Sequence, residues 1–136
     1  MKKLLFLLLL TGTASVGYGQ TAAATPAPNT DNPVFEWDGQ TFDFGKIKQG
    51  VPVTHEFKFT NKGKGALLIA NAQPSCGCTT PDWSRQPVPP GQQGFIKATY
   101  NAGGSGAFEK TISITSNVEG GPVVLRIKGE VTPAVQ

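Results

Sequence analysis

The chain has 136 residues, a formal net charge of +3 and only 15% charged residues. Two of its lysines, Lys2 and Lys3, belong to an N-terminal segment that we expect to be removed, and their loss lowers the formal charge from +3 to +1. The remaining Lys and Arg residues are interspersed with acids, so the composition excludes a basic stripe of the kind that binds nucleic acid.

Residues 1–19 have the three parts of a secretory signal peptide. Residues 1–3 carry positive charge, residues 4–10 are an unbroken apolar run, and small residues stand at Gly17 and Gly19. The run is shorter than the ~20 apolar residues of a transmembrane helix, and no amphipathic pattern follows that would favour a buried N-terminal helix. We therefore expect cleavage after Gly19 and export to the periplasm or the extracellular space, with no transmembrane segment left and no cysteine at the cleavage point to carry a lipid.

The next part of the chain changes from a leader to a folded domain. Residues 20–32 are mostly Ala, Thr, Pro and Asn without periodicity, which predicts a flexible extended leader. Aromatic residues then begin at Phe35 and Trp37 and continue at Phe42 and Phe44. The remaining length suits one domain with a single core, which we predict over residues 33–132.

Alternation of apolar and polar residues predicts a strand over residues 51–59 with one buried face. Its apolar residues occupy odd positions: Val51, Val53, Phe57 and Phe59. His55 lies on the same face, where a lone histidine is more often a hydrogen-bonded core residue than a metal ligand. Pro52 suits an edge strand or the start of a strand, because it has no backbone N–H to donate.

Four further strands are predicted, separated by turn residues. They cover residues 66–72, 95–100, 108–116 and 123–131. Apolar residues lie on both faces of the first, whereas the other three have one inward row each: Ile96, Ala98 and Tyr100; Phe108, Ile112 and Ile114, with Lys110; and Val123, Leu125, Ile127 and Val131. Turns are predicted at residues 61–65, at Pro89–Pro90–Gly91 and at residues 117–121, and a hairpin connection at residues 103–106.

These elements predict the fold class. Helical spacing of apolar residues does not extend beyond one turn anywhere, and neither an internal repeat nor a second domain is visible. Short alternating strands with Gly, Pro and Asn turns between them favour an all-β, immunoglobulin-like antiparallel β-sandwich of about seven strands.

The aromatic, glycine and cysteine positions of the folded part form a recognisable set. They are Phe42, Phe44, Gly45, Ile47, Gly50, His55, Phe57, Phe59, Asn61, Gly63, Leu68, the Ser-Cys-Gly-Cys-Thr segment at residues 75–79, Pro90, Gly91, Gly106, Phe108, Lys110, Ser116, Asn117, Gly129 and Val131. This set resembles the bacterial family called domain of unknown function 1573 over residues 42–131. The resemblance implies an exported immunoglobulin-like domain, similar in shape to the β-sandwich modules of ciliary and major-sperm-protein type. It implies no established activity and therefore no catalytic residue.

The chain has two cysteines, Cys76 and Cys78, with one residue between them. An exported pair suggests a disulfide, but a three-residue loop contributes only roughly 1.6 kcal/mol in the chain-entropy model. If the bond forms, with Gly77 allowing the tight backbone, thiol–disulfide exchange is a more natural purpose than stabilisation. Against a thioredoxin-like enzyme, the sequence lacks the two-residue spacing and the βαβ unit of that class.

Other roles for the two cysteines stay open. As thiolates they could hold Cu(I), with His55 as a weaker third ligand, although one histidine and one Cys pair do not make a closed zinc site. They could instead be small buried residues packed near Trp83, or thiols that pair with another chain. No cofactor is expected unless Cu(I) binds Cys76 and Cys78.

The sequence favours a binding protein over an enzyme. It has no Gly-x-Ser-x-Gly nucleophile elbow, and the glycines at residues 103–106 lack the Lys and helix of a phosphate-binding loop. We therefore predict an exported, non-enzymatic β-sandwich module that binds another macromolecule, a protein or another envelope component. The alternatives are a thiol–disulfide or Cu(I)-handling protein that uses Cys76 and Cys78, and a plain structural spacer.

Overall fold

A computed structural model describes residues 31–134 of the chain, and within this range it contains eight β-strands and no helix. The strands are β1 (Phe35–Trp37), β2 (Thr41–Lys48), β3 (Val53–Asn61), β4 (Ile69–Pro74), β5 (Thr79–Trp83), β6 (Gln93–Tyr100), β7 (Gly106–Ser116) and β8 (Val123–Thr132). The described part therefore offers no helix that could cross a membrane. The predicted signal peptide, and the predicted leader up to residue 30, lie outside the described residues.

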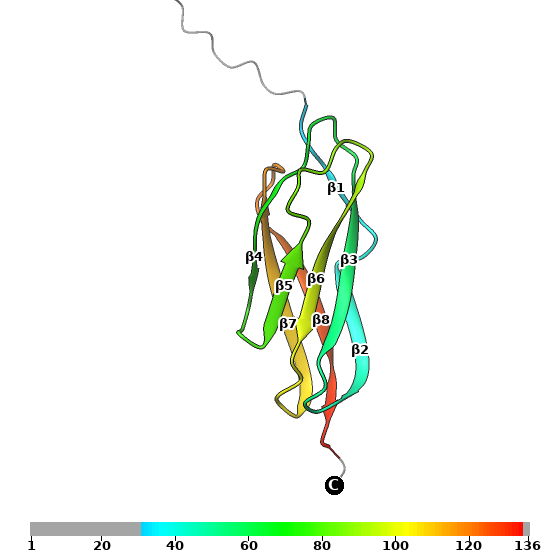
Figure 1. Ribbon diagram of the computed structural model, residues 1–136, viewed down its shortest axis with the longest axis vertical. Coiled ribbons are helices and arrows are strands. Elements are labelled where there is room, and N and C mark those ends of the chain that lie inside the picture. Colours follow the sequence, from blue (N-terminus) through cyan, green and yellow to red (C-terminus); the bar gives the residue numbers. More distant parts are fainter. Residues whose placement is uncertain (1–30, 135–136) are drawn as a thin grey trace, which may run out of the picture.

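The strands form two four-stranded sheets that pack face to face (Figure 1). One sheet has the order β1-β3-β6-β5 and the other β2-β8-β7-β4. The predicted all-β sandwich is confirmed, with eight strands where about seven were expected. Pairing is antiparallel except between β2 and β8, which are parallel. That pair arises because the chain leaves β1, crosses to the other sheet between Trp37 and Thr41, and continues beside the last strand.

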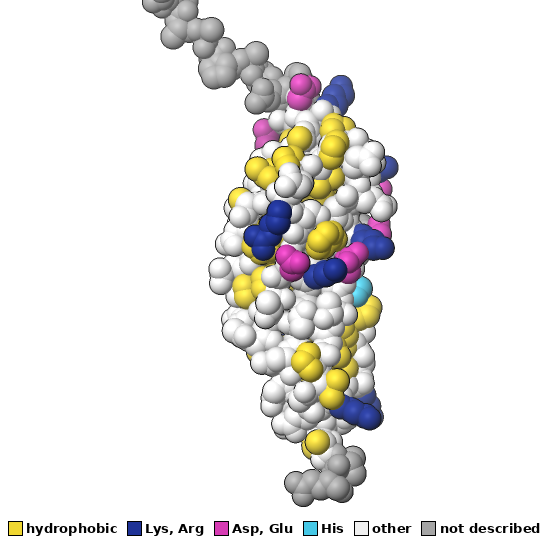
Figure 2. Space-filling view, viewed as in Figure 1, with side chains coloured by type: hydrophobic (Ala, Val, Ile, Leu, Met, Phe, Trp, Pro, Cys, Tyr) yellow, Lys and Arg dark blue, Asp and Glu magenta, His cyan; other side chains and the backbone are white. Residues whose placement is uncertain are grey.

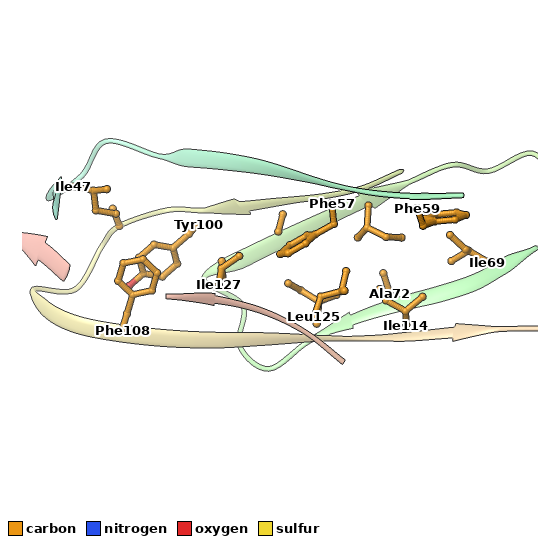
Figure 3. Close-up of a cluster of buried hydrophobic side chains, with 14 of the residues drawn as sticks. Ile47, Phe57, Phe59, Ile69, Ala72, Tyr100, Phe108, Ile114, Leu125 and Ile127 are labelled. Atoms are coloured by element: carbon orange, nitrogen blue, oxygen red, sulfur yellow. The ribbon is translucent and has the colours of Figure 1, made fainter. Parts of the chain in front are cut away.

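The core lies between the two sheets and is built from the predicted inward rows. Figure 3 shows Phe57 and Phe59 projecting from one layer toward Leu125 and Ile114 from the other. All the predicted inward residues of 95–100 are buried, as are Phe108, Ile112, Ile114, Leu125, Ile127 and Val131. Gly94 is part of this packing, because a Cβ there would collide with the Phe59 ring.

Several local predictions need correction. Val51 is 52% exposed and precedes the strand, because a turn closed by the bond from its N–H to the Lys48 carbonyl delays the start of β3 until after Pro52. The strand predicted over residues 66–72 begins at Ile69, and Leu68 is 42% exposed.

Two predicted connections also turn out differently. Residues 103–106 do not form a hairpin connection, because β6 and β7 belong to different sheets. Asn61, predicted in a turn, is the buried last residue of β3. In contrast, the turn at Pro89–Gly91 is confirmed, with the Gln92 N–H donating to the Pro89 carbonyl at 3.1 Å and Gly91 at φ 78°.

Candidate functional site

The switch from β1 to β2 leaves half of β3 without a neighbour on one side. β1 pairs with β3 only from Phe59 to Asn61, and the last bond runs from the Asp38 N–H to the Lys58 carbonyl at 3.1 Å. In an antiparallel ladder, alternate residues direct both backbone groups to the same side. Since the Lys58 carbonyl points toward β1, the backbone N–H and C=O groups of Thr54 and Glu56 must point to that same side of β3. Among residues 31–134, no strand pairs with them there. We call the stretch Thr54–Glu56 the open edge of β3.

A hollow of about 310 Å³ lies beside the open edge, and we call it the rim groove. It is lined by residues of β2 and β3 and of the crossing between the sheets: Asp38, Gly39, Thr41, Phe42, His55, Glu56, Phe57 and Lys58. In Figure 1, β2 and β3 run along the right-hand side of the molecule, with β1 above β2. The groove therefore exists because the chain leaves one sheet edge before the strand beside it has ended.

Stacked rings line the rim groove. The His55 ring lies flat against Phe42, with centroids 3.6 Å apart and planes 7° apart, and it meets the edge of Phe57 at 4.7 Å. Phe44 packs against Phe42 edge-on at 4.9 Å. His55 and Phe42 are partly exposed, whereas Phe57 is buried. The groove thus presents an aromatic surface directly beside unpaired backbone groups, which offers both apolar contact and main-chain hydrogen bonds to an occupant.

Burial lowers the pKa of His55 below its ordinary value of 6.5, although the nearby Glu56 carboxylate acts in the opposite direction. The neutral form of the ring therefore predominates at pH 7. A neutral ring suits its stacking on Phe42, because an imidazolium in the same place would lose hydration. The structure does not show the hydrogen-bonded core histidine that the alternation suggested, since His55 is half-buried and its contacts are ring contacts.

A charged row crosses the outer face of the sheet at the level of Glu56. The Lys97 Nζ is 3.6 Å from the Glu56 carboxylate, and β6 places Lys97 opposite Asp82 of β5. Arg85 is 3.6 Å from Asp82 and lies over the Trp83 ring. Figure 2 shows dark blue and magenta side chains across this face, with the cyan histidine close to its right-hand end. These pairs are exposed and contribute little stability, but they leave Glu56 engaged by Lys97.

The two cysteines lie at the opposite side of the molecule, in the corner between β4 and β5. They are joined by a disulfide, with Cα atoms 5.3 Å apart, and both are half-buried. Cys78 packs against the hydrophobic core, as does Trp83. The sequence left open whether the pair is bonded, and the structure places it in a disulfide instead of as two buried thiols.

The structure does not bring His55 to the cysteines. His55 of β3 pairs with Ala98 of β6, and β5, which begins directly after Cys78, lies on the other side of β6. Two strand spacings amount to roughly 10 Å. In the part of the chain from 31 to 134, no three His, Cys, Asp or Glu residues converge in a way that would hold a metal ion.

A larger hollow of about 520 Å³ lies over β2, β7 and β8. Its charged lining includes Asp43, Lys46, Glu109, Lys128 and Glu130. It lies over three strands that are paired with one another, and its lining is of mixed charge without the stacked rings of the rim groove. We therefore take the rim groove, although smaller, as the better candidate site.

Sequence reasoning missed the rim groove but not all of its residues. His55 was singled out as a candidate, and Phe42 was noted as an aromatic residue at the start of the domain. Pro52 had indicated an edge strand or a strand start, because it has no backbone N–H to donate, but it did not show which part of the edge is open. The crossing between Trp37 and Thr41 contains the turn pair Asp38–Gly39, but that pair does not indicate that the chain moves to the other sheet.

Similar folds occur among solved structures of low sequence identity. A protein of unknown function from Porphyromonas gingivalis is similar with a TM-score of 0.67 and 20% identity, over 79% of this chain and 51% of that protein. This chain therefore spans about half the length of that protein. The PapD-like domain 7 of human CEP192 matches with a TM-score of 0.59 and 12% identity, over 83% of this chain and 93% of that domain. The Vibrio cholerae VesB protease matches with a TM-score of 0.56 and 14% identity, over 71% of this chain and 31% of that protein.

Comparison of the sequence with family models gave a match over residues 35–131 to the family described as "Protein of unknown function (DUF1573)". This match spans all strands from β1 to β8 except the last residue of β8. No match was found among curated proteins. The structural similarities, all at 20% identity or less, indicate the fold alone.

Proposed function

We propose that this chain, which belongs to the DUF1573 family of proteins of unknown function, is an exported, non-enzymatic module that binds an extended segment of another protein in the cell envelope. The segment would add to the sheet as a strand along the open edge of β3. Strand addition is a common mode of peptide recognition, in which backbone bonds supply affinity and alternate side chains supply specificity.

The unpaired backbone of Thr54 and Glu56 is the observation that carries the proposal. β1 ends at Trp37, so the edge of β3 is covered along one half and open along the other. Proteins usually protect such an edge, because unpaired N–H and C=O groups invite association. Here the open half lies beside a groove lined with aromatic rings, which supports recognition of a partner.

The lining of the rim groove suggests the chemistry of the segment. Side chains that point inward from an added strand would meet Phe42, His55 and Phe57, so apolar residues are expected at alternate positions. Of the polar groups at the rim, Glu56 is paired with Lys97. The Glu56 carboxylate therefore already has a partner in the free protein.

A proline at position 56 tests the proposal. Glu56→Pro removes the N–H that an added strand would use, and β6 loses no backbone hydrogen bond because the Glu56 backbone faces away from it. Glu56→Ala is the matched control, since it also removes the carboxylate but keeps the N–H. We expect the proline variant to lose at least tenfold in affinity for a partner captured from an envelope extract, and the alanine variant to stay near wild type.

Hydrogen exchange gives a second measurement on the same site. In the free protein the amides of Thr54 and Glu56 should exchange fast and those of His55 and Phe57 slowly, because the latter two donate to β6. The captured partner should slow the first two amides. Equal binding by the proline and alanine variants, or protection confined to other strands, would refute strand addition at this edge.

A further inference from the structure

The Cys76–Cys78 disulfide has little value as a staple. Its ring contains one intervening residue, Gly77, so closing it removes less chain entropy than any longer loop would. The two cysteines also lie between β4 and β5, and both of these strands are already held in place by pairing with β7 and β6. The presence of the bond therefore calls for a reason other than stability.

Hydrogen bonds of Ser75 and Cys78 hold the two ends of the disulfide segment without help from the sulfurs. The Ser75 N–H donates to the Thr111 carbonyl at 2.8 Å, and the Thr111 N–H donates to Ser75 Oγ at 3.1 Å. On the other side, the Asn101 N–H donates to the Cys78 carbonyl at 3.0 Å. Reduction would thus leave the two thiols close together on a folded scaffold, ready to form the bond again.

The corner is open to an incoming thiol. Gly77 is exposed, and a Cβ built on it would meet nothing within 4 Å. Cys78 packs against the core, whereas Cys76 does not belong to that packing. Cys76 is therefore the sulfur that a partner reaches more easily. Its Sγ is 3.9 Å from the Thr79 hydroxyl, a donor that can stabilise a thiolate.

From these observations we propose that Cys76–Cys78 is an exchangeable disulfide that oxidises a pair of thiols in another polypeptide. A partner thiolate attacks Cys76 Sγ, a mixed disulfide forms, and Cys78 leaves as a thiolate that takes a proton from water. The partner's second thiolate then attacks the partner's own sulfur in the mixed disulfide. The partner's disulfide forms, and Cys76 leaves as a thiolate next to Thr79 and is protonated. Two electrons pass from the partner's thiols to the pair.

The test is a titration of the purified protein with reduced and oxidised glutathione, read by alkylation of free thiols and mass spectrometry. We expect the pair to interconvert reversibly while circular dichroism shows a folded protein in both states. Cys78→Ser leaves Cys76 alone and should form the glutathione adduct several-fold faster than Cys76→Ser, which leaves Cys78. Thr79→Val should slow release of Cys76, whereas Thr80→Val on the exposed face serves as the matched control.

Three results would overturn the proposal. The first is reduction that occurs only when the protein unfolds, because the bond would then be structural. The second is equal adduct formation by the two serine variants together with no effect of Thr79→Val. The third is protein isolated from its producing cell with Cu(I) on two free thiols, because the pair would then serve a metal. None of these results bears on the Glu56 variants, so the two proposals fail independently.

Discussion

At the scale of single residues, Asn61 ties three segments together from a fully buried position. Its Oδ1 accepts from the N–H groups of Val34 and Gly63, at 3.2 and 3.0 Å. Its Nδ2 donates to the carbonyls of Gly65 and Val88, at 2.7 and 2.9 Å. Every hydrogen-bonding position of the amide is therefore used, which explains why a polar side chain is stable inside the sandwich.

We expect Asn61→Ala to lower the free energy of unfolding by about 3 kcal/mol, because four backbone groups lose their partner and the bond to the Val88 carbonyl is buried. Urea denaturation measures the change. Asn117→Ala is the control, since that side chain makes two bonds in an exposed position and should cost about 1 kcal/mol. Similar losses for the two variants would show that burial adds nothing at position 61.

His55 should make stability depend on pH. Because burial lowers its pKa in the folded protein, the unfolded chain takes up a proton at a higher pH than the folded one. The contribution of the neutral ring is therefore complete above pH 6.5 and is lost as the pH falls through the folded pKa. His55→Phe keeps a ring on Phe42 but cannot titrate, so its melting temperature should fall less between pH 7 and pH 5. Parallel curves for wild type and variant would contradict this.

At the scale of elements, four of the five strands that the sequence predicted have a regular alternation and one buried face. The fifth, predicted over residues 66–72 from apolar residues on both faces, is β4, and its bounds were misplaced. β2 was missed because its alternation breaks: Phe42 and Phe44 point inward, but the irregularity between Asp43 and Lys46 shifts the next inward residue to Ile47. β1 has three residues, too few for a pattern, and β5 contains a proline at Pro81.

The rim groove could not be predicted for a related reason. It depends on how many residues of β1 pair with β3 before the chain crosses to the other sheet, and such a choice between two sheets is made by long-range packing. The cysteine corner was visible in the sequence as a motif. Its bonding state was not, because one spacing is compatible with a disulfide, free thiols or a metal ligand pair.

At the scale of the whole molecule, the two proposed activities lie at opposite rims of one sandwich. β2 and β3 form the rim that carries the groove, and β4 and β5 form the rim that carries the disulfide. β6 lies between β3 and β5, so a partner strand at one rim would not cover the other. The core that holds both rims in place is shared, since buried side chains from both sheets form a single cluster.

β1 covers one half of the β3 edge. Removing β1 tests whether this cover contributes to stability and prevents association through the edge. Phe35 and Trp37 stack at 4.8 Å and both pack against Phe59, at 4.9 and 5.1 Å. A chain that starts at residue 39 would lose these two partly buried rings and leave all of β3 open. We expect it to lose about 4 kcal/mol in urea denaturation, from the apolar burial of two aromatic side chains.

The shortened chain should also associate with itself, because a long open edge pairs with other edges. Size-exclusion chromatography would show dimers or larger species, whereas a chain that starts at residue 31 keeps β1 and should elute as wild type does. Glu56→Pro in the shortened chain should reduce the association, because it blocks the part of the edge that both chains share. If the shortened chain stays as stable and as monomeric as the longer one, β1 does not protect the edge. An exposed β3 edge would then not be enough to bind another strand, which would count against the open edge as a binding site.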